Sequence, residues 1–398
     1  MTSGLAPARP SLSGVTVLDL TRLLPGNYAS LLLYGLGANV IKVEELGGDG
    51  TRLAPPFSSG GESGANIALN RGKSSIAINL KSAEGADLLA RLVADAEVLL
   101  DSFRPGVLDR LGFSDVELAR LNPTLVHVSL TAYGDDGPYR MLPSHDLNVQ
   151  SLAGLVGLSV DDSGRPAMPG VQAGDLATGL QAALAVMSGL RAAAGDGRGY
   201  RAQVAMSDSA LSLTTLAAGH LAAGTGSLPA ARDMLTGALA CYGVYECADH
   251  SWVAVGGLEP KFFTRMCELM GVPDLAALQY DLAAQDQLRT DLAAVFATRP
   301  RQEWLELLLA EDTCVTPVNN VAEAFADANA VQRGVIVAAA RQDGEPAPVV
   351  RAVPWLPEAP GASAGPVGAE TGQILRSLGV DPDRFDDLRR RGIVGGGP

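Results

Sequence analysis

The chain has 398 residues, of which 47% are hydrophobic and 19% are charged, and its 30 basic against 44 acidic residues give a formal net charge of −14. This composition excludes a disordered or collagen-like polymer and is sufficient for a large core divided between two domains. The negative charge argues against a protein that wraps nucleic acid or lies on an anionic membrane, so an anion site must be a local patch.

The first 130 residues alternate short β-branched runs with helical stretches. This alternation predicts parallel strands joined by right-handed helical crossovers, and therefore a doubly wound, mostly parallel α/β sheet that is Rossmann-like. Gly37 follows a helix rather than a strand, so we interpret it as a helix C-cap and not as part of a dinucleotide-binding loop. The expected strands are 15–20, 38–44, 97–101 and 125–131, and the expected helices are 27–36, 83–94 and 114–121.

Further elements with capping residues at their starts follow in the chain. We expect helices over 145–155 and 175–193, then a strand over 200–206 and a helix over 207–223. The segment GTGSLPAARD (224–233) breaks this pattern and is the predicted linker.

From Gly243 the hydrophobic pattern changes to alternation, which predicts a smaller α+β domain. Its expected elements are a β-hairpin over 244–257 and helices over 260–270, 282–297 and 301–311. The Pro- and Gly-rich tail is expected to wrap an existing surface. The predicted division is a large α/β domain (1–224), a small α+β domain with linkers (225–330) and a C-terminal segment returning to the large domain (331–398).

Cysteine usage and the N-terminus bear on the compartment. Cys241, Cys247, Cys267 and Cys314 form no CxxC pair, and no histidine stands at metal-ligand spacing, which argues against structural disulfides and a metal site. The N-terminal residues lack the apolar core of a signal peptide, and no run of about 18 apolar residues follows. We therefore expect a cytoplasmic protein.

Four residues at expected helix starts are candidates for acid–base chemistry. His145 and Asp146 stand where backbone N–H groups and the positive end of a helix dipole can stabilise developing negative charge. Asp175 begins the next expected helix, and Glu259 precedes a proline where the hairpin passes into a helix. Each of these side chains also suits a structural role as a cap, so the residues alone leave both interpretations open.

A basic cluster stands out because the chain has only four lysines, three of them between positions 42 and 81. The cluster contains Lys42, Arg71, Lys73 and Arg104. Lys42 and Arg104 lie at or just after expected strand ends, where open α/β sheets bind ligands. A phosphate-bearing ligand would fit these residues, and the alternative is scattered surface charge.

Several motifs in this order resemble the class III CoA-transferases, also called the CaiB/BaiF family, and within it the α-methylacyl-CoA racemases. The resemblance extends from about Leu12 to Pro317. It rests on LSGVTVLDLTRLLPGNYASLLLYGLGANVIKVE, LKSAEG, DSFRPGVLDRLG, SLTAYGDDGPY, SHDLN, the AGD ending at Asp175, YECAD, VAVGGLEPKFF and DTCVTPV.

The resemblance implies two alternative chemistries on an acyl-CoA thioester. In the racemase branch, residues matching His145 and Asp175 are two acid–base groups, and one matching Glu259 partners the histidine. In the transferase branch the residue matching Asp175 is a nucleophile that forms an acyl-aspartyl intermediate. The presence of all three residues favours racemisation of a 2-methylacyl-CoA through an enolate, whereas GDLATG, and Val149 where racemases often have an aromatic residue, keep the transferase alternative open.

The resemblance also implies roles for the remaining candidates. The backbone N–H of Asp146 would stabilise the enolate oxygen, while Lys42, Arg71, Lys73 and Arg104 would contact CoA. No metal, nicotinamide or flavin is implied beyond the CoA of the substrate. The family forms an interlocked homodimer, in which Glu259 would act across the subunit boundary. A CoA-binding protein without turnover is a third interpretation, which would leave the two potential bases unexplained.

Overall fold

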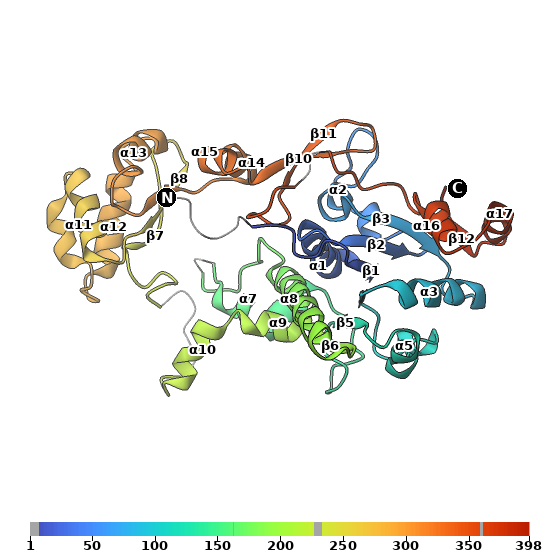
Figure 1. Cartoon of the computed structure of the whole chain (residues 1–398). Coiled ribbons are helices and arrows are strands. Elements are labelled where there is room, and N and C mark those ends of the chain that lie inside the picture. The colour runs from blue at the N-terminus through green and yellow to red at the C-terminus, as the bar shows by residue number, and fades with distance from the viewer. Residues whose placement is uncertain (1–7, 162, 227–232, 359–360, 398) are drawn as a thin grey trace, which may run out of the picture. The chain divides into compact units, whose positions relative to one another are not determined.

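The described residues of the computed structural model form two compact units (Figure 1). The first unit contains the chain up to Leu155, Gly170–Thr214 and the chain from Arg333 onward, and the second contains Val156–Pro169 and Thr215–Gln332. The described residues are 8–161, 163–226, 233–358 and 361–397. Residues 227–232 of the predicted linker therefore lie outside the described part of the chain.

A seven-stranded sheet lies at the centre of the part of the first unit that the structure describes. Its neighbouring strands are parallel except at one edge, where β12 pairs antiparallel with β3. In sheet order the strands are β12 (Val394–Gly395), β3 (Ser74–Ile78), β2 (Asn39–Glu44), β1 (Thr16–Leu20), β4 (Val98–Asp101), β5 (Val126–Thr131) and β6 (Tyr200–Ala205). The prediction of a mostly parallel α/β sheet is confirmed.

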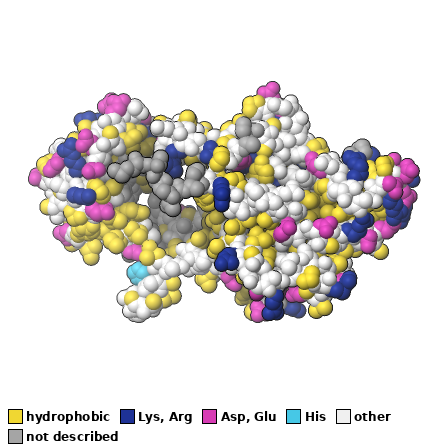
Figure 2. Space-filling view, viewed as in Figure 1, with side chains coloured by type: hydrophobic (Ala, Val, Ile, Leu, Met, Phe, Trp, Pro, Cys, Tyr) yellow, Lys and Arg dark blue, Asp and Glu magenta, His cyan; other side chains and the backbone are white. Residues whose placement is uncertain are grey.

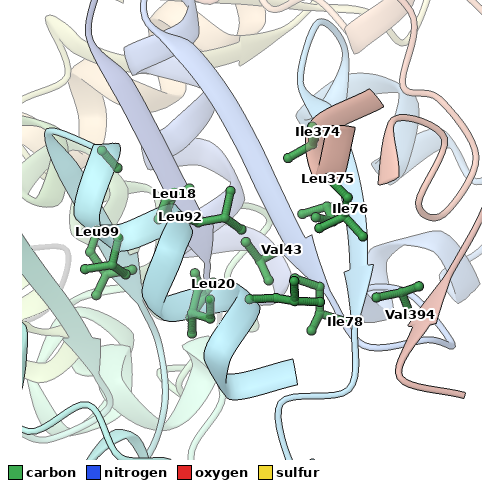
Figure 3. Packing of buried hydrophobic residues seen from close by; sticks show 14 of the residues in the cluster. Leu18, Leu20, Val43, Ile76, Ile78, Leu92, Leu99, Ile374, Leu375 and Val394 are labelled. Atoms are coloured by element: carbon green, nitrogen blue, oxygen red, sulfur yellow. The ribbon is translucent and has the colours of Figure 1, made fainter. Parts of the chain in front are cut away.

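Alternate residues of the strands face opposite helical layers, as the period of two in a strand requires. Val17 of β1 belongs to a buried cluster with residues of α1 and α8, whereas Leu18 belongs to a second cluster with residues of α3, α5, α16 and α17. Figure 3 shows this second cluster, with Ile76 of the sheet near Leu375 of α16 and Leu18 near Leu92 of α3. These helices are α1 (Leu23–Gly35), α3 (Ala83–Asp95), α5 (Asp115–Leu121), α8 (Ala173–Asp196), α16 (Thr371–Ser377) and α17 (Pro382–Arg390).

The C-terminal segment packs on the central sheet through α16 and β12. Its helix α17 also forms ion pairs with α3, in which Arg384 and Arg391 both contact Glu84. Figure 2 shows acidic and basic side chains next to one another in this region. The other short elements of the first unit are η1 (Gly50–Leu53), α2 (Gly64–Asn70), α4 (Val107–Arg110), α6 (Asp146–Leu152), α9 (Met206–Ser212), β10 (Ile336–Ala340) and β11 (Pro346–Val350).

The second unit contains the predicted β-hairpin, which is confirmed. Strand β8 pairs antiparallel with β7 and with β9, and the buried cluster of this unit contains Phe296, which stacks on Tyr245 and contacts Trp304 edge to face. Its strands are β7 (Tyr242–Glu246), β8 (Trp252–Gly256) and β9 (Val315–Pro317). Its helices are α10 (Thr215–Ala222), α11 (Pro260–Leu269), η2 (Pro273–Leu278), α12 (Gln285–Phe296), α13 (Arg301–Leu308), α14 (Val321–Ala326) and α15 (Ala328–Gln332).

Two predicted helices are shorter than expected. The helix expected over 145–155 ends at Leu152, because Gly154 has a left-handed φ of 85°, and a short helix α7 (Leu155–Leu158) follows. The helix expected over 207–223 is divided into α9 and α10. At the break, the hydroxyl of Thr214 donates to the carbonyl of Leu211 (2.7 Å), a local bond that competes with the regular helical pattern.

Candidate active site

A cavity of about 1060 Å³ lies in the first unit at the carboxyl ends of the parallel strands. Its lining includes Leu20 at the end of β1, Ile78 at the end of β3, Phe103 after β4 and Thr131 at the end of β5. The chain order of the strands reverses between β1 and β4, and open α/β sheets bind ligands at such a switch point. The sheet topology therefore places the cavity where a ligand site is expected.

The starts of α6 and α8 approach each other closely at the cavity because position 174 is a glycine. A Cβ atom there would lie 2.9 Å from Val149 Cγ2 and 3.0 Å from Asp146 Oδ1. Any larger residue would have to displace one of these neighbours. Gly174 thus allows Asp146 and Asp175 to lie next to each other although 28 other residues separate them in the sequence.

Three of the four predicted catalytic residues line this one cavity: His145, Asp146 and Asp175. His145 is the exposed N-cap residue of α6, and its backbone N–H donates to Asn148 Oδ1 at 3.1 Å. Asp146 is the first helical residue of α6, and Asp175 belongs to the first turn of α8. Two helix N-termini therefore present an imidazole and a carboxyl group to the same space.

Asp175 has an unusual environment for a carboxyl group. Its backbone N–H donates to Asp146 Oδ1 at 3.0 Å, while its own Oδ1 atom is buried and has no hydrogen-bond partner among the described residues. Burial, and then the negative charge of Asp146, raise the pKa of Asp175 to about 7. A carboxyl group with this pKa can both donate and accept a proton near neutral pH.

Glu259 lies in the second unit, so its predicted interaction with His145 stays a prediction. It is the N-cap residue of α11, directly before Pro260, and its exposed side chain makes no capping hydrogen bond. The loop before it is held by Gln279, whose amide donates to the carbonyls of Gly257 (2.9 Å) and Leu258 (2.8 Å). The carboxylate of Glu259 therefore does not cap α11, and the backbone before it is fixed by Gln279.

Three of the four predicted CoA-contacting residues are buried and do not line the cavity. The Nζ atom of Lys42 donates to Thr21 O (2.9 Å) and lies 3.5 Å from Asp19 Oδ2. Lys73 donates to backbone and side-chain oxygens of α1 and α2, and burial lowers its pKa to about 7 against the opposing effect of Asp19. Arg71 forms an ion pair with Glu358 (2.7 Å). Each of these three cations is therefore bonded to groups of the protein itself and does not face the cavity.

Arg104 does line the cavity, together with three exposed basic residues that are not predicted as ligands from the sequence. They are Arg22 after β1, Lys81 after β3 and Arg140 before α6. Lys81 could have been predicted as a ligand if β3 had been predicted, because it follows the end of that strand. The run SSIAI of β3 is short and begins with two serines, and it is not predicted as a strand from the sequence. Among the described residues, no group of three His, Cys, Asp or Glu side chains could hold a metal ion.

Comparisons with known proteins agree with this architecture. The family model described as CoA-transferase family III matches residues 12–371. The chain is 29% identical to an alpha-methylacyl-CoA racemase of Mus musculus, covering 96% of this chain and 97% of the relative, and 30% identical to a succinyl-CoA–L-malate CoA-transferase beta subunit of Chloroflexus aurantiacus, covering 96% and 98%. A crystal structure of a CaiB/BaiF family protein from Brucella suis superposes with a TM-score of 0.82 at 27% identity, covering 93% of this chain and all of that one.

Proposed function

The chain belongs to CoA-transferase family III, and we propose that within this family it inverts the α-carbon of a 2-methylacyl-CoA thioester by two-base proton transfer. The observation that carries this proposal is that His145 and Asp175 line one cavity at the carboxyl edge of the sheet. Relatives named as racemases and relatives named as CoA-transferases are about equally similar to the chain, so the choice of chemistry rests on these side chains.

The proposed reaction moves one proton off the α-carbon and returns one to the opposite face. The imidazole of His145 takes the proton, the electron pair of the broken C–H bond moves into the thioester carbonyl, and an enolate forms. The carboxylic acid form of Asp175 then protonates the α-carbon from the other side, and the reverse direction exchanges the two roles. Substrate and product have the same composition, so no co-reactant is required.

The environment of Asp175 suits this exchange of roles. Because the pKa of Asp175 is raised to about 7, a substantial fraction of Asp175 carries the required proton at neutral pH. The backbone N–H of Asp146, in the first turn of α6, would donate to the enolate oxygen, and losing one such donor costs about 100-fold in rate.

We propose that the exposed basic residues that line the cavity bind CoA. Arg104 follows β4 and Lys81 follows β3, and Arg22 and Arg140 lie in other segments of the same lining. Guanidinium and ammonium groups bind phosphate oxygens by charge-assisted hydrogen bonds, which suits the phosphates of CoA. The reaction would need no cofactor beyond the CoA of its own substrate.

A second candidate function is transfer of CoA between carboxylic acids. It is favoured by the Asp175 Oδ1 atom, which lacks a partner among the described residues and is adjacent to a cavity. Its carboxylate would attack the thioester carbonyl, form an acyl-aspartyl anhydride and release the CoA thiolate. The thiolate would then attack the aspartyl carbonyl of the anhydride, which releases the donor acid and leaves Asp175 as a CoA thioester. An acceptor carboxylate would attack this thioester to form a second anhydride and release the thiolate, which would finally take the acceptor acyl group and free the Asp175 carboxylate.

Chiral analysis with an added acceptor separates the two functions. The protein is incubated with one enantiomer of a 2-methylacyl-CoA, with and without a free carboxylic acid, and both the enantiomeric ratio and any new thioester are followed. We expect the enantiomers to interconvert without an added acid. A new thioester that forms only with the acid, while the enantiomeric ratio stays unchanged, would support transfer and overturn racemisation.

A further inference from the structure

Gln150 is a buried polar side chain that the proposed reaction does not use. It lies on α6, is only 3% exposed and does not line the cavity. Its Nε2 group donates two hydrogen bonds, to Asp146 Oδ2 (2.5 Å) and to the carbonyl of Val171 (3.1 Å). Because a buried amide is costly unless it is bonded, these two contacts define how the side chain is held.

The hydrogen bonds of Gln150 continue to Asp175. Gln150 bonds one oxygen of the Asp146 carboxylate, and the other oxygen accepts from the backbone N–H of Asp175 (3.0 Å). The second contact of Gln150, with Val171, reaches the segment that enters α8. The amide of Gln150 thus connects the Asp146 carboxylate on α6 with the segment that leads into α8.

We propose that Gln150 is a positioning residue, which fixes the Asp146 carboxylate beside the first turn of α8 and through it controls the environment of Asp175. This inference rests on the proposed function, because it takes Asp175 as the reacting carboxyl group. It concerns the state of Asp175 in the resting protein, so it can be tested without turnover.

Asp146 is the charged neighbour that acts on Asp175. Burial and then the Asp146 charge raise the pKa of Asp175, and His145 and Arg140 face the same cavity. The other charged groups on elements packed against α8 have partners elsewhere or are exposed. They are Asp208 on α9, bonded to Ser207; His127 on β5, bonded to Asp101; and Arg201 on β6, paired with Asp115 and Asp135. Burial raises the pKa of Tyr28 and of Tyr34 on α1, so both phenols are neutral near pH 7.

Loss of the Gln150 amide would remove part of the effect of the Asp146 charge on the pKa of Asp175. Without its donor, the Asp146 carboxylate either turns toward solvent or takes up a proton. Both changes reduce the negative charge next to Asp175, so its pKa falls, by about one pH unit for a charge at this range. Burial remains, and the pKa stays above the ordinary value for aspartic acid.

The test is a direct titration of the Asp175 carboxyl group by infrared difference spectroscopy, with Asp175→Asn as the blank. We expect the midpoint in Gln150→Leu to lie about one pH unit below that of the unsubstituted protein. The matched control is Gln181→Leu, since Gln181 is a glutamine of α8 that also bonds a side chain across a helix pair, to Ser212 Oγ at 3.0 Å. The same midpoint in all three proteins would overturn the proposal.

Turnover provides a second readout that a general structural role would not produce. In Gln150→Leu, the limb of the kcat profile that reports Asp175 should move with the titration midpoint, while KM stays unchanged because Gln150 does not line the cavity. A fall in kcat with an unmoved profile would also overturn the proposal. Absence of both racemisation and transfer would refute the proposed function but leave the titration result valid.

A nearly isosteric variant, Gln150→Glu, covers the case in which Gln150→Leu does not fold. The carboxyl group that this substitution introduces can donate to Asp146 only while it is protonated. We expect the variant to approach the unsubstituted protein at low pH and to lose activity as the pH rises and the two carboxylates repel. A profile identical to that of the unsubstituted protein at every pH would contradict the proposed role.

Discussion

At the scale of single residues, Asp175 occupies a position that favours its chemistry at the expense of stability. The first turn of a helix normally stabilises a carboxylate, yet burial and the adjacent Asp146 raise the pKa of Asp175 instead. Its ionised form is therefore disfavoured in the folded protein.

We expect Asp175→Asn to stabilise the protein increasingly as the pH rises. Below about pH 4 the carboxyl group is protonated in both the folded and the unfolded chain and has little effect. Between about pH 4 and pH 7 the unfolded chain ionises first, so folding stability is lost as the pH rises toward the folded-state pKa. After allowance for solvent screening, the Tm of the variant should exceed that of the unsubstituted protein by about 2–4 °C at pH 8. A Tm difference independent of pH would contradict this explanation.

The basic residues show where prediction from sequence reaches its limit. The rarity of lysine points to Lys42 and Lys73, but both are enclosed with Asp19, whose carboxylate lies 23 residues or more away along the chain. Arg71 is likewise paired with Glu358, 287 residues away. Local sequence cannot distinguish a cation that faces a ligand from one that faces a distant carboxylate.

For Arg104 we expect a binding effect that is separate from the chemistry. Replacement by alanine removes a charge-assisted hydrogen-bond donor from the cavity, so the KM for acyl-CoA should rise about tenfold or more with kcat little changed. Steady-state kinetics measure KM and kcat separately. Arg120→Ala is the control, because Arg120 is an exposed arginine paired with Glu117 on α5 and does not line the cavity. Equal KM values for the two variants would exclude a contact between Arg104 and CoA.

At the scale of elements, the patterns that the sequence encodes locally predict the fold well. The strands that form β1, β2, β4, β5 and β6 are predicted to within one or two residues, because each is a short apolar run between helices. Strand β12 has only two residues and depends on its pairing with β3, which no local pattern reveals. The nearness of α6 and α8 is likewise a tertiary feature.

This contact between α6 and α8 can be tested through Gly174. In Gly174→Ala, the new Cβ would lie 2.9 Å from Val149 Cγ2 and 3.0 Å from Asp146 Oδ1, so the two helix starts must separate. We expect a destabilisation of about 1–3 kcal/mol and a loss of most activity.

Gly195→Ala provides the control for this substitution in the same helix. Its added Cβ would have only Arg191 Nη1 nearby, at 3.8 Å, and alanine is the better helix former. The control should therefore keep both stability and activity. Full activity in Gly174→Ala would show that the close approach of α6 and α8 is not required.

At the scale of the whole molecule, exposed leucines support the proposal of a homodimer. Leu180 and Leu184, one helical turn apart on α8, are 53% and 69% exposed, and Leu211 on α9 is 55% exposed. Helix α8 as a whole is apolar: among the described residues it is the one helix long and apolar enough, by length and composition only, to cross a membrane. Apolar patches on a folded protein commonly mark an interface. We propose that a second copy of the chain covers these leucines.

A charged substitution in this patch should separate the two subunits. For Leu184→Lys we expect dimer, activity and folded fraction to decrease together, because an interlocked subunit need not have a folded monomer. Sedimentation and circular dichroism on the same samples measure this. Val116→Lys on α5, at a valine that is 80% exposed, is the control and should remain dimeric. A folded, active monomer of Leu184→Lys would contradict the interlocked dimer.

The central claim, that an imidazole and a carboxyl group act on one α-carbon, is tested most directly by solvent deuterium incorporation. A 2-methylacyl-CoA is incubated in deuterated water, without an added carboxylic acid, with the unsubstituted protein and with His145→Ala. The account predicts deuterium at the α-carbon of both enantiomers with the unsubstituted protein, whereas His145→Ala, which still binds CoA, should incorporate none into the enantiomer whose α-proton faces position 145. Full incorporation by His145→Ala would contradict it.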